Sequence, residues 1–380
     1  MAEAPAILPP PERTSHPFHM HTMIGQIPDA IRATLRRNEA RFAEIAHRSR
    51  DRTSVVFTGC GTAFFAAMLA ERAIASYDDG SVASSALQAF ELMWYRPRRS
   101  PSTLAIGISH SGITRATVDA LRVSRERGAS TVGITHFEAR PIGSVADATI
   151  LAGNGPDESR CHTKCYVAGA IAGSELGLAF LRARGTNPSG LEDCEEGIRS
   201  LPDLVEKVAR SSERDAERLA GTYRKAQDFY FVGGGPNEPT AFEAALKMKE
   251  SSFVRAEGME LEQMLHGPWI SLDHGTVLFV IAPMGPSRDR ASDLLLAARK
   301  LGVQTVAVTS EGDEKLTSAA DFAFEIPAVD EYLSAYLAII PLYYFAYYAS
   351  VLRGQNPDYL RYLTPAYWSA RHAIFPPGTH

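Results

Sequence analysis

The chain has 380 residues, of which 45% are hydrophobic and 22% are charged, and this composition excludes wholesale disorder. A formal net charge of −5 argues against a protein that binds nucleic acid through bulk positive charge. Four cysteines are too few for a disulfide scaffold, so we expect a reduced, cytoplasmic protein.

The N-terminal residues predict an irregular arm that leads into a helix. Three consecutive prolines follow one another at Pro9 to Pro11, and no basic stretch precedes an apolar run, so the segment does not read as a secretory signal. Apolar residues then recur at helical spacing, which predicts a helix over residues 23–47.

Short apolar runs alternate with amphipathic stretches through the first half of the chain. Strands are predicted at 54–58, 103–108 and 130–135, with helices at 63–77 and 116–128. Alternation of this kind is typical of βαβ units and a parallel sheet.

The same pattern returns in the second half of the chain. Strands are predicted at 229–232, 276–281 and 304–309, with a helix at 289–302. Gly233 follows Gly59, and Thr309 follows Thr135, at the same spacing of about 174 residues, which indicates two copies of one fold. We therefore expect an α/β protein of two domains, each a parallel sheet flanked by helices in a flavodoxin-like three-layer sandwich.

The expected organisation has five parts. They are an arm (1–22), a first domain with its N-terminal helix (23–190), a helical connection (191–225), a second domain (226–356) and a tail (357–380). Residues 333–352 carry no charge and are long enough for a membrane span. Because this segment contains Pro341 and five tyrosines, we interpret it as a buried core or interface helix.

A cluster of hydroxyl side chains follows the predicted strand at 103–108. Ser109, Ser111 and Thr114 surround Gly112 where the next helix should begin, and a helix N-terminus with added hydroxyls suits a tetrahedral anion such as phosphate. The alternative is that one serine only caps the helix. The turn Gly-Cys-Gly-Thr at 59–62 also permits close backbone approach to a ligand, through Gly61 for example.

The segment 241–250 reads as a strongly helical stretch. Glu243, Lys247 and Glu250 share one helix face, and this feature alone favours a solvated stripe of ion pairs. His266 follows 16 residues after Glu250, so a carboxylate and an imidazole in one segment could form an acid–base pair.

Together these motifs resemble a known family. The turn at 59–62, SHSGIT at 109–114, Thr163-Lys164, EAALKMKE at 243–250 and HGP at 266–268 occur in the order of the tandem sugar isomerase (SIS) family. The layout is similar to the isomerase half of glucosamine-6-phosphate synthase and to stand-alone sugar-phosphate isomerases, deaminases and deglycases. The resemblance covers roughly residues 23–364.

The resemblance implies roles for individual residues. Glu250 would move a proton between C1 and C2 of the open-chain sugar through an enediol, and Lys247 would orient this base or stabilise the enediolate. His266 would open the sugar ring from the partner subunit, which implies a homodimer with a shared active site. The anionic end of the sugar would be bound by Gly61, Thr62, Ser109, His110, Ser111, Thr114, Arg160, His162 and Thr163. No cofactor and no metal are expected.

Two departures from the family bear on the chemistry. No glutaminase domain precedes the first helix, so ammonia from glutamine is not an expected substrate. Tyr362 stands where the synthase has its imine-forming lysine, and no lysine follows Lys315. An imine route through that lysine is excluded, whereas aldose–ketose isomerisation needs only a base and an acid.

A third departure lies in the anion site. His110 replaces the usual glutamine of this loop, and Arg160 and His162 add basic character. Because arginine suits strong oxyanions, we hypothesise a C6 anion other than phosphate, such as the 6-sulfonate of sulfoquinovose or sulfofructose. The alternative is that Arg160 faces solvent or pairs with Asp157 or Glu158.

Two other patterns are weaker. Cys161 and Cys165 flank His162, but their spacing is not CxxC and no second pair exists, so the sequence predicts no zinc site. The C-terminal tail either contributes His372 to a neighbouring site or serves as a packing arm.

The sequence therefore predicts an aldose–ketose isomerase for a sugar with an anionic group at C6. The alternatives are a deglycase or deaminase of an aminated 6-phosphosugar, which would use the same glutamate, and a non-catalytic sugar-phosphate sensor. Neither a nucleic-acid partner nor a membrane is expected.

Overall fold

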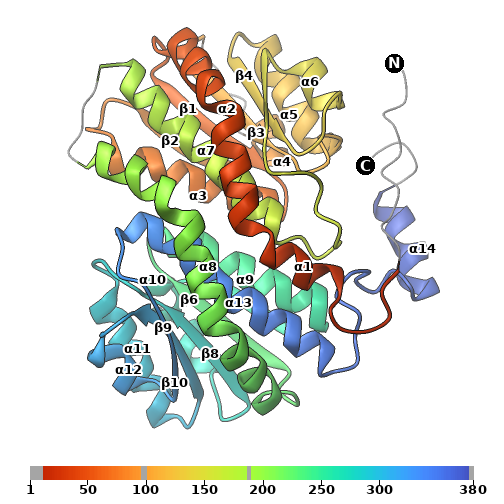
Figure 1. Cartoon of the computed structure of the whole chain (residues 1–380), viewed down its shortest axis with the longest axis vertical. Helices are drawn as coiled ribbons and strands as arrows, with labels where there is room; N and C mark the ends of the chain where they lie inside the picture. The colour runs from red at the N-terminus through yellow and green to blue at the C-terminus, as the bar shows by residue number, and fades with distance from the viewer. Residues whose placement is uncertain (1–11, 96–100, 186–189, 376–380) are drawn as a thin grey trace.

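The computed structural model describes residues 12–95, 101–185 and 190–375, and the proline run of the predicted arm lies outside these residues. The described chain forms two α/β domains stacked end to end (Figure 1). Each domain contains one five-stranded parallel sheet, in the orders β2-β1-β3-β4-β5 and β10-β9-β8-β6-β7. The predicted fold class is confirmed.

Two helices, α1 (His19–Gly25) and α2 (Ile27–Ser49), precede the first sheet. The first domain then comprises β1 (Ser54–Gly59), α3 (Thr62–Tyr77), β2 (Ala83–Gln88), α4 (Ala89–Trp94), β3 (Thr103–Ile108), α5 (Arg115–Glu126), β4 (Ser130–Thr135), α6 (Pro141–Val145), β5 (Ala148–Leu151) and α7 (Lys164–Ala183). The long helix α8 (Leu191–Thr222) connects the two domains.

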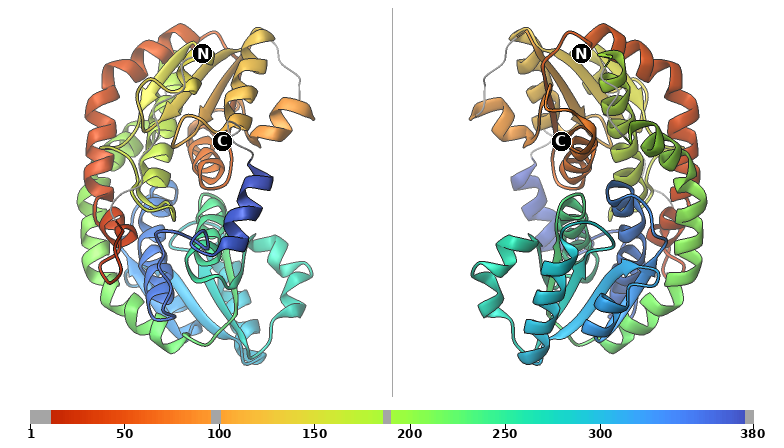
Figure 2. Two further views of the ribbon diagram at one scale, coloured as in Figure 1. Left: turned by 90° about the vertical axis from the view of Figure 1, so that its right-hand side faces the viewer. Right: turned by 90° about the vertical axis from the view of Figure 1, so that its left-hand side faces the viewer.

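The second domain comprises β6 (Asp228–Gly233), α9 (Asn237–Ser252), β7 (Arg255–Glu260), α10 (Leu261–Leu265), the 3-10 helix η1 (Pro268–Ser271), β8 (Thr276–Ile281), α11 (Arg288–Lys300), β9 (Gln304–Ser310), α12 (Glu314–Ala319), β10 (Phe322–Ile326) and α13 (Glu331–Val351). A last helix, α14 (Pro365–Ile374), follows this domain and stands to one side of both (Figures 1 and 2). Matched strand for strand, the two sheets have the same order, so the predicted duplication is confirmed.

The central strands are buried because their sequences are apolar on both faces. Every residue of β3 and of β8 is buried, as expected for parallel strands covered by helices on both sides. The predicted boundaries of β3, β4 and β8 agree with the structure. The edge strands β2, β5, β7 and β10 were not predicted, because β2 and β7 mix polar and small residues and β5 and β10 are only four and five residues long.

The two domains meet through helices that belong to corresponding positions in each copy. Helix α3 packs against α9, and α2 packs against α8, while α13 packs against α8 and α9 on the side of the second domain. Helix α13, which contains most of the uncharged segment at 333–352, is buried nearly throughout, as predicted.

Among the described residues, one helix is long and apolar enough to cross a membrane by length and composition. This helix is α7, and 89% of its apolar window is buried inside the structure. It packs against α2 and α3, so its apolar surface belongs to the core.

Candidate active site

A cavity of about 1020 Å³ is lined by residues of both domains and of the C-terminal segment. The first domain contributes the ends of strands β1, β3 and β4 and the loop before α7, where ligands of parallel sheets bind. The second domain contributes Leu246 and Glu250 from α9. Arg371, Ile374 and Phe375 line the cavity from α14 and the residue after it, and Phe90 and Met93 line it from α4.

The predicted anion loop lies on the cavity wall. Ser111 and Thr114 line the cavity, and Thr114 is the N-cap residue of α5. Gly112 has φ +67°, and a Cβ at this position would lie 2.6 Å from the Cβ of Arg140. The tight loop therefore depends on glycine at position 112.

Two predicted ligands of the anion do not line the cavity. Ser109 is buried behind the loop, where its hydroxyl accepts a hydrogen bond from Gly112 N and donates one to Thr114 Oγ1, both at 3.1 Å. Its role is to shape the loop. Thr163 is fully buried, and its backbone N–H donates to Asp157 Oδ2 at 2.9 Å. Gly61, Thr62, His110, Arg160 and His162, which were also predicted to bind the anion, do line the cavity.

Three histidines gather on the first-domain side of the cavity. The ring centroid of His110 lies 4.4 Å from that of His162 and 5.1 Å from that of His136. Burial lowers the pKa of His110 and of His136 well below the usual value, and nearby cationic groups, including Lys164, lower both further. The Asp157 N–H donates to His110 Nε2 at 3.1 Å, so the proton of the neutral His110 ring is held on Nδ1.

Arginines add positive charge to the cavity wall. Arg160 lines the cavity but is also exposed to solvent, and among the residues that the structure describes it forms no ion pair with Asp157 or Glu158. Glu158 instead contacts His19 Nδ1 at 2.9 Å. Arg140 and Arg371 also line the cavity, and the sequence analysis missed both. His372, one of the two roles considered for the tail, contacts the Trp368 carbonyl oxygen, whereas its neighbour Arg371 lines the cavity.

The predicted base and its lysine form an ion pair at the cavity. The Lys247 ammonium lies 2.6 Å from Glu250 Oε2 and donates to Thr62 Oγ1 at 3.0 Å. The Lys247 side chain is buried, whereas the Glu250 side chain is 26% exposed and lines the cavity. This arrangement presents a carboxylate to a ligand and keeps its counter-ion behind it.

A second carboxylate, that of Glu243, lies close to the Lys247 ammonium on the side away from the cavity. Glu243 is fully buried, lies 3.5 Å from Lys247 Nζ, and accepts hydrogen bonds from Thr62 Oγ1 at 3.0 Å and Tyr343 OH at 3.1 Å. Burial raises the pKa of Glu243 to about 7, although Lys247 opposes the shift. Burial alone would lower the pKa of Lys247, but the two carboxylates outweigh it and raise this pKa well above its usual value.

Taken alone, the 241–250 helix favoured a solvated stripe of ion pairs, and that interpretation is wrong. Helix α9 is covered by α3, α13 and the strands β6 and β7, so the face that carries Glu243 and Lys247 points into the protein. A stripe of charge that is buried in this way is costly unless its members neutralise one another.

The single chain does not bring His266 to Glu250. The His266 side chain is 72% exposed, and its Nδ1 lies 2.7 Å from the Glu262 carbonyl oxygen, away from the cavity. His266 could therefore reach a cavity of this kind only in another subunit, and its contribution to a partner's site stays a prediction.

In the second domain, the loop that corresponds to the anion loop is filled by the protein itself. A Cβ on Gly285 would lie 2.0 Å from the carboxyl carbon of Glu331, so this carboxyl group occupies the loop. Arg288 at the start of α11 is paired with Asp313, with Nε 2.6 Å from Oδ2. The loop of the second domain is therefore filled by the side chain of Glu331, whereas the corresponding loop of the first domain faces the cavity.

The fold and this cavity define a tandem SIS protein. The SIS domain family matches residues 50–173 and 222–353, and the chain belongs to this family. Among curated relatives, the glutamine–fructose-6-phosphate aminotransferase (isomerizing) of Mycobacterium tuberculosis is 32% identical over 361 residues, which cover 91% of this chain and 57% of the relative. The chain thus spans little more than half the length of the curated relatives it matches.

Solved structures have the same fold. The C-terminal domain of glucosamine-fructose-6-phosphate aminotransferase from Francisella tularensis gives a TM-score of 0.83 at 20% identity, covering 92% of this chain and 99% of that one. Tagatose-6-phosphate ketose/aldose isomerase from Escherichia coli gives 0.74 at 20% identity, with coverage of 92% and 96%. Glucosamine-6-phosphate deaminase from Thermotoga maritima gives 0.69 at 19% identity, with coverage of 90% and 96%.

Proposed function

We propose that this chain is an aldose–ketose isomerase that acts on a sugar with an anionic group at C6. The observation that carries the proposal is the Glu250 carboxylate at the cavity, with the Lys247 ammonium 2.6 Å behind it. A basic, hydroxyl-bearing wall in the same cavity suits the anionic end of the sugar.

In the proposed reaction, Glu250 takes the C2 proton of the open-chain aldose. The electron pair of the C2–H bond forms the C1=C2 bond of an enediolate, and the carbonyl electrons move to O1, which takes up a proton. Glu250 then returns its proton to C1 while O2 loses its hydroxyl proton, which gives the ketose. A positioned general base of this kind contributes about 10²–10⁴-fold to a rate.

Lys247 has two roles in this scheme. Its charge is secured by Glu243 below and by Glu250 above, so it stays an ammonium throughout the working pH range. It keeps the base in one orientation through a charge-assisted hydrogen bond, and it offers positive charge near the developing enediolate.

The anion at C6 would sit between the loop at 109–114 and the basic side chains. Ser111 and Thr114 offer hydroxyl donors, and Arg160 and Arg140 supply charge. A sulfonate and a phosphate share this tetrahedral oxyanion geometry, and arginines suit both anions, so our hypothesis that a 6-sulfonate is accepted is decided by the substrate test below. Replacement of Arg160 by methionine should weaken binding of the true substrate by roughly tenfold, and unchanged affinity would remove Arg160 from the site.

The proposal includes a homodimer in which His266 opens the sugar ring in the partner's cavity. The exposure of His266 in one protomer is compatible with this role. Mixing inactive Glu250→Gln and His266→Asn chains tests the arrangement, because a random mixed dimer contains one intact site. About a quarter of wild-type activity should then return on mixing. A mixture that stays inactive although its chains exchange would contradict the shared site.

Proton NMR in D₂O tests the reaction and the anion together. Purified protein is incubated separately with glucose 6-phosphate, fructose 6-phosphate and sulfoquinovose. Deuterium at C2 of an aldose, with ketose formed, is the expected result, and the productive tube identifies the anion. If no deuterium is incorporated and no ketose forms with any of the three sugars, an aminated 6-phosphosugar is tested next. Release of its amine would favour deaminase or deglycase chemistry at the same glutamate.

A further inference from the structure

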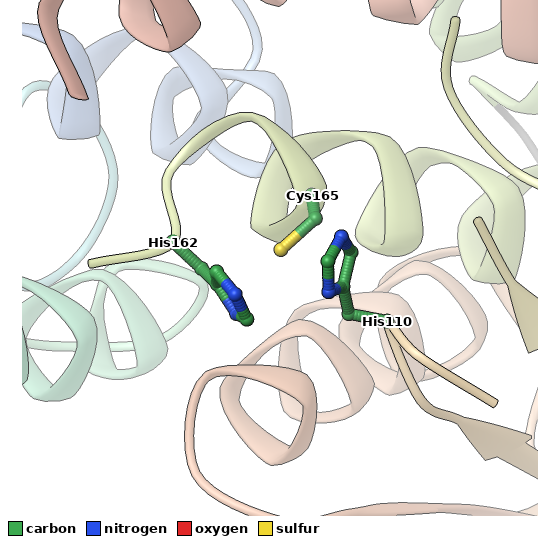
Figure 3. Close-up of side chains that lie close together, drawn as sticks. All are labelled: His110, His162 and Cys165. Atoms are coloured by element: carbon green, nitrogen blue, oxygen red, sulfur yellow. The ribbon is translucent and has the colours of Figure 1, made fainter. Parts of the chain in front are cut away.

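Three side chains of types that can ligate transition metals meet on the first-domain wall of the cavity. His110 comes from the loop after β3, His162 from the segment before α7, and Cys165 from the first turn of α7. Their ligating atoms all lie within 4.8 Å of one another. Figure 3 shows the two imidazole rings and the thiol turned toward a common point.

The donor set has a definite chemistry. Two imidazoles and a thiol suit borderline divalent ions such as Zn²⁺ and Co²⁺ and do not suit Mg²⁺ or Ca²⁺, which prefer oxygen ligands. The spacing of Cys161 and Cys165 gave no sign of this site, because His110 lies more than 50 residues before them. Only the fold brings the third ligand to the pair formed by His162 and Cys165.

A neighbouring side chain gives a second, independent observation. His136 is 5% exposed and lines the same cavity, and among the described residues neither of its ring nitrogens has a hydrogen-bond partner. A buried imidazole without a partner is costly unless something else satisfies it. The ring centroid of His136 lies 5.1 Å from that of His110. The two unpartnered nitrogens of His136 therefore indicate that a ligand binds at the same wall.

The charges around the three side chains affect both the binding of a cation and the identity of its fourth ligand. Lys164 opposes a cation, but the buried Asp157 carboxyl, whose Oδ1 is also unpartnered, offsets it. His110 Nε2 now accepts from the Asp157 N–H, so ligation through this atom costs one backbone hydrogen bond. The cavity is otherwise basic, with Arg140 and Arg160 in its lining, so an anion would fill the open coordination position.

We infer that His110, His162 and Cys165 form a site for Zn²⁺ or Co²⁺ on the cavity wall, with an anion as the fourth ligand. Three protein ligands with one open position are the arrangement of metal sites that bind an exchangeable ligand. All three residues line the cavity, so that position opens toward the space that a sugar anion would occupy. This inference goes beyond the proposed isomerisation and does not depend on it.

Cobalt titration of the full chain, freed of metal by a chelator, tests the inference without any sugar. We expect one equivalent of Co²⁺ to bind, with the visible bands of tetrahedral cobalt and a sulfur-to-cobalt charge-transfer band in the near ultraviolet. Cys165→Ser should lose the charge-transfer band, whereas Cys194→Ser, which changes a buried thiol of α8, should keep it.

A second variant keeps the test decisive if Cys165→Ser fails to fold. His162 is only partly buried, and His162→Gln should weaken Co²⁺ binding by about tenfold or more while circular dichroism stays unchanged. Absence of saturable cobalt binding by the wild-type chain would overturn the inference. A charge-transfer band that persists in Cys165→Ser would place the metal elsewhere and overturn it equally.

Discussion

The buried ion pair between α9 residues makes a pH-dependent prediction about stability. In the folded protein, burial raises the pKa of Glu243 from 4.5 to about 7. The folded chain therefore holds a proton that the unfolded chain releases over this interval. Stability falls as pH rises from about 4.5 to about 7, at up to about 1.4 kcal/mol per pH unit, and this contribution levels off above pH 7.

The perturbation is Lys247→Met, which keeps the length of the side chain and removes its charge. The ammonium lies 3.5 Å from Glu243 and lowers the pKa of that carboxyl, so its loss raises the pKa of Glu243 further. The decline in stability should then continue above pH 7. From pH 7 to pH 8.5 the variant should lose stability at up to about 1.4 kcal/mol per pH unit, whereas wild type, whose Glu243 is already half ionised at pH 7, has little of this decline left. The variant should therefore lose up to about 1.6 kcal/mol relative to wild type over this interval.

Urea unfolding followed by circular dichroism, at fixed protein concentration and at several pH values between 6 and 8.5, measures this difference. Lys249→Met is the matched control, because Lys249 is exposed two residues further along the same helix. The double variant with Glu243→Gln lacks the titrating carboxyl and should recover the wild-type slope. If Lys247→Met parallels wild type from pH 7 to pH 8.5, the two charges are not coupled as described.

Three further predictions concern the cavity and the second domain. Gly112→Ala forces a Cβ to within 2.6 Å of Arg140 at a positive φ, so the KM for the anionic sugar should rise roughly tenfold or more in steady-state assays; an unchanged KM would remove the loop from the binding site. Arg371→Met removes a cationic side chain of the cavity wall and should raise the substrate Kd by about tenfold in titration calorimetry, with a weaker salt dependence, whereas the same change at the exposed Arg299 of α11 should not. Hydrogen bonding by Arg288 lowers the pKa of Asp313 to about 2, so this pair stabilises the fold above pH 3.8 and the gain is lost as pH falls toward 2. Asp313→Asn should therefore lower the Tm at pH 6, and the difference from wild type should shrink below about pH 4; a constant difference would refute this linkage.

The sequence predicted the parts of the fold whose signal is local. Strands β3 and β8 are short, mainly apolar runs and β4 is rich in β-branched residues, and the alternation of such runs with amphipathic helices located all three. The pairing of Lys247 with Glu250 followed from their i, i+3 spacing on a helix.

Features that depend on contacts between distant segments were not predicted. The burial of Glu243 comes from α3 and α13, which cover α9 from far along the chain. Arg371 reaches the cavity because α14 lies beside it, and the pattern of the tail gave no reason to prefer Arg371 over His372. Ser109 faces the interior of the loop, where its hydroxyl accepts from the N–H of Gly112, a residue at positive φ. The spacing of Ser109, Ser111 and Thr114 in the sequence does not show which of the three hydroxyls turns inward.

The central claim is that Glu250 transfers the proton between C1 and C2. The most direct measurement compares wild type and Glu250→Gln for deuterium uptake from D₂O at C2 of the productive sugar, with binding followed by calorimetry in parallel. We expect exchange and turnover to fall together by about 10³-fold, within the range of a lost general base, while the Kd changes only a few-fold. Exchange at the wild-type rate in Glu250→Gln, with the sugar still bound, would contradict the account.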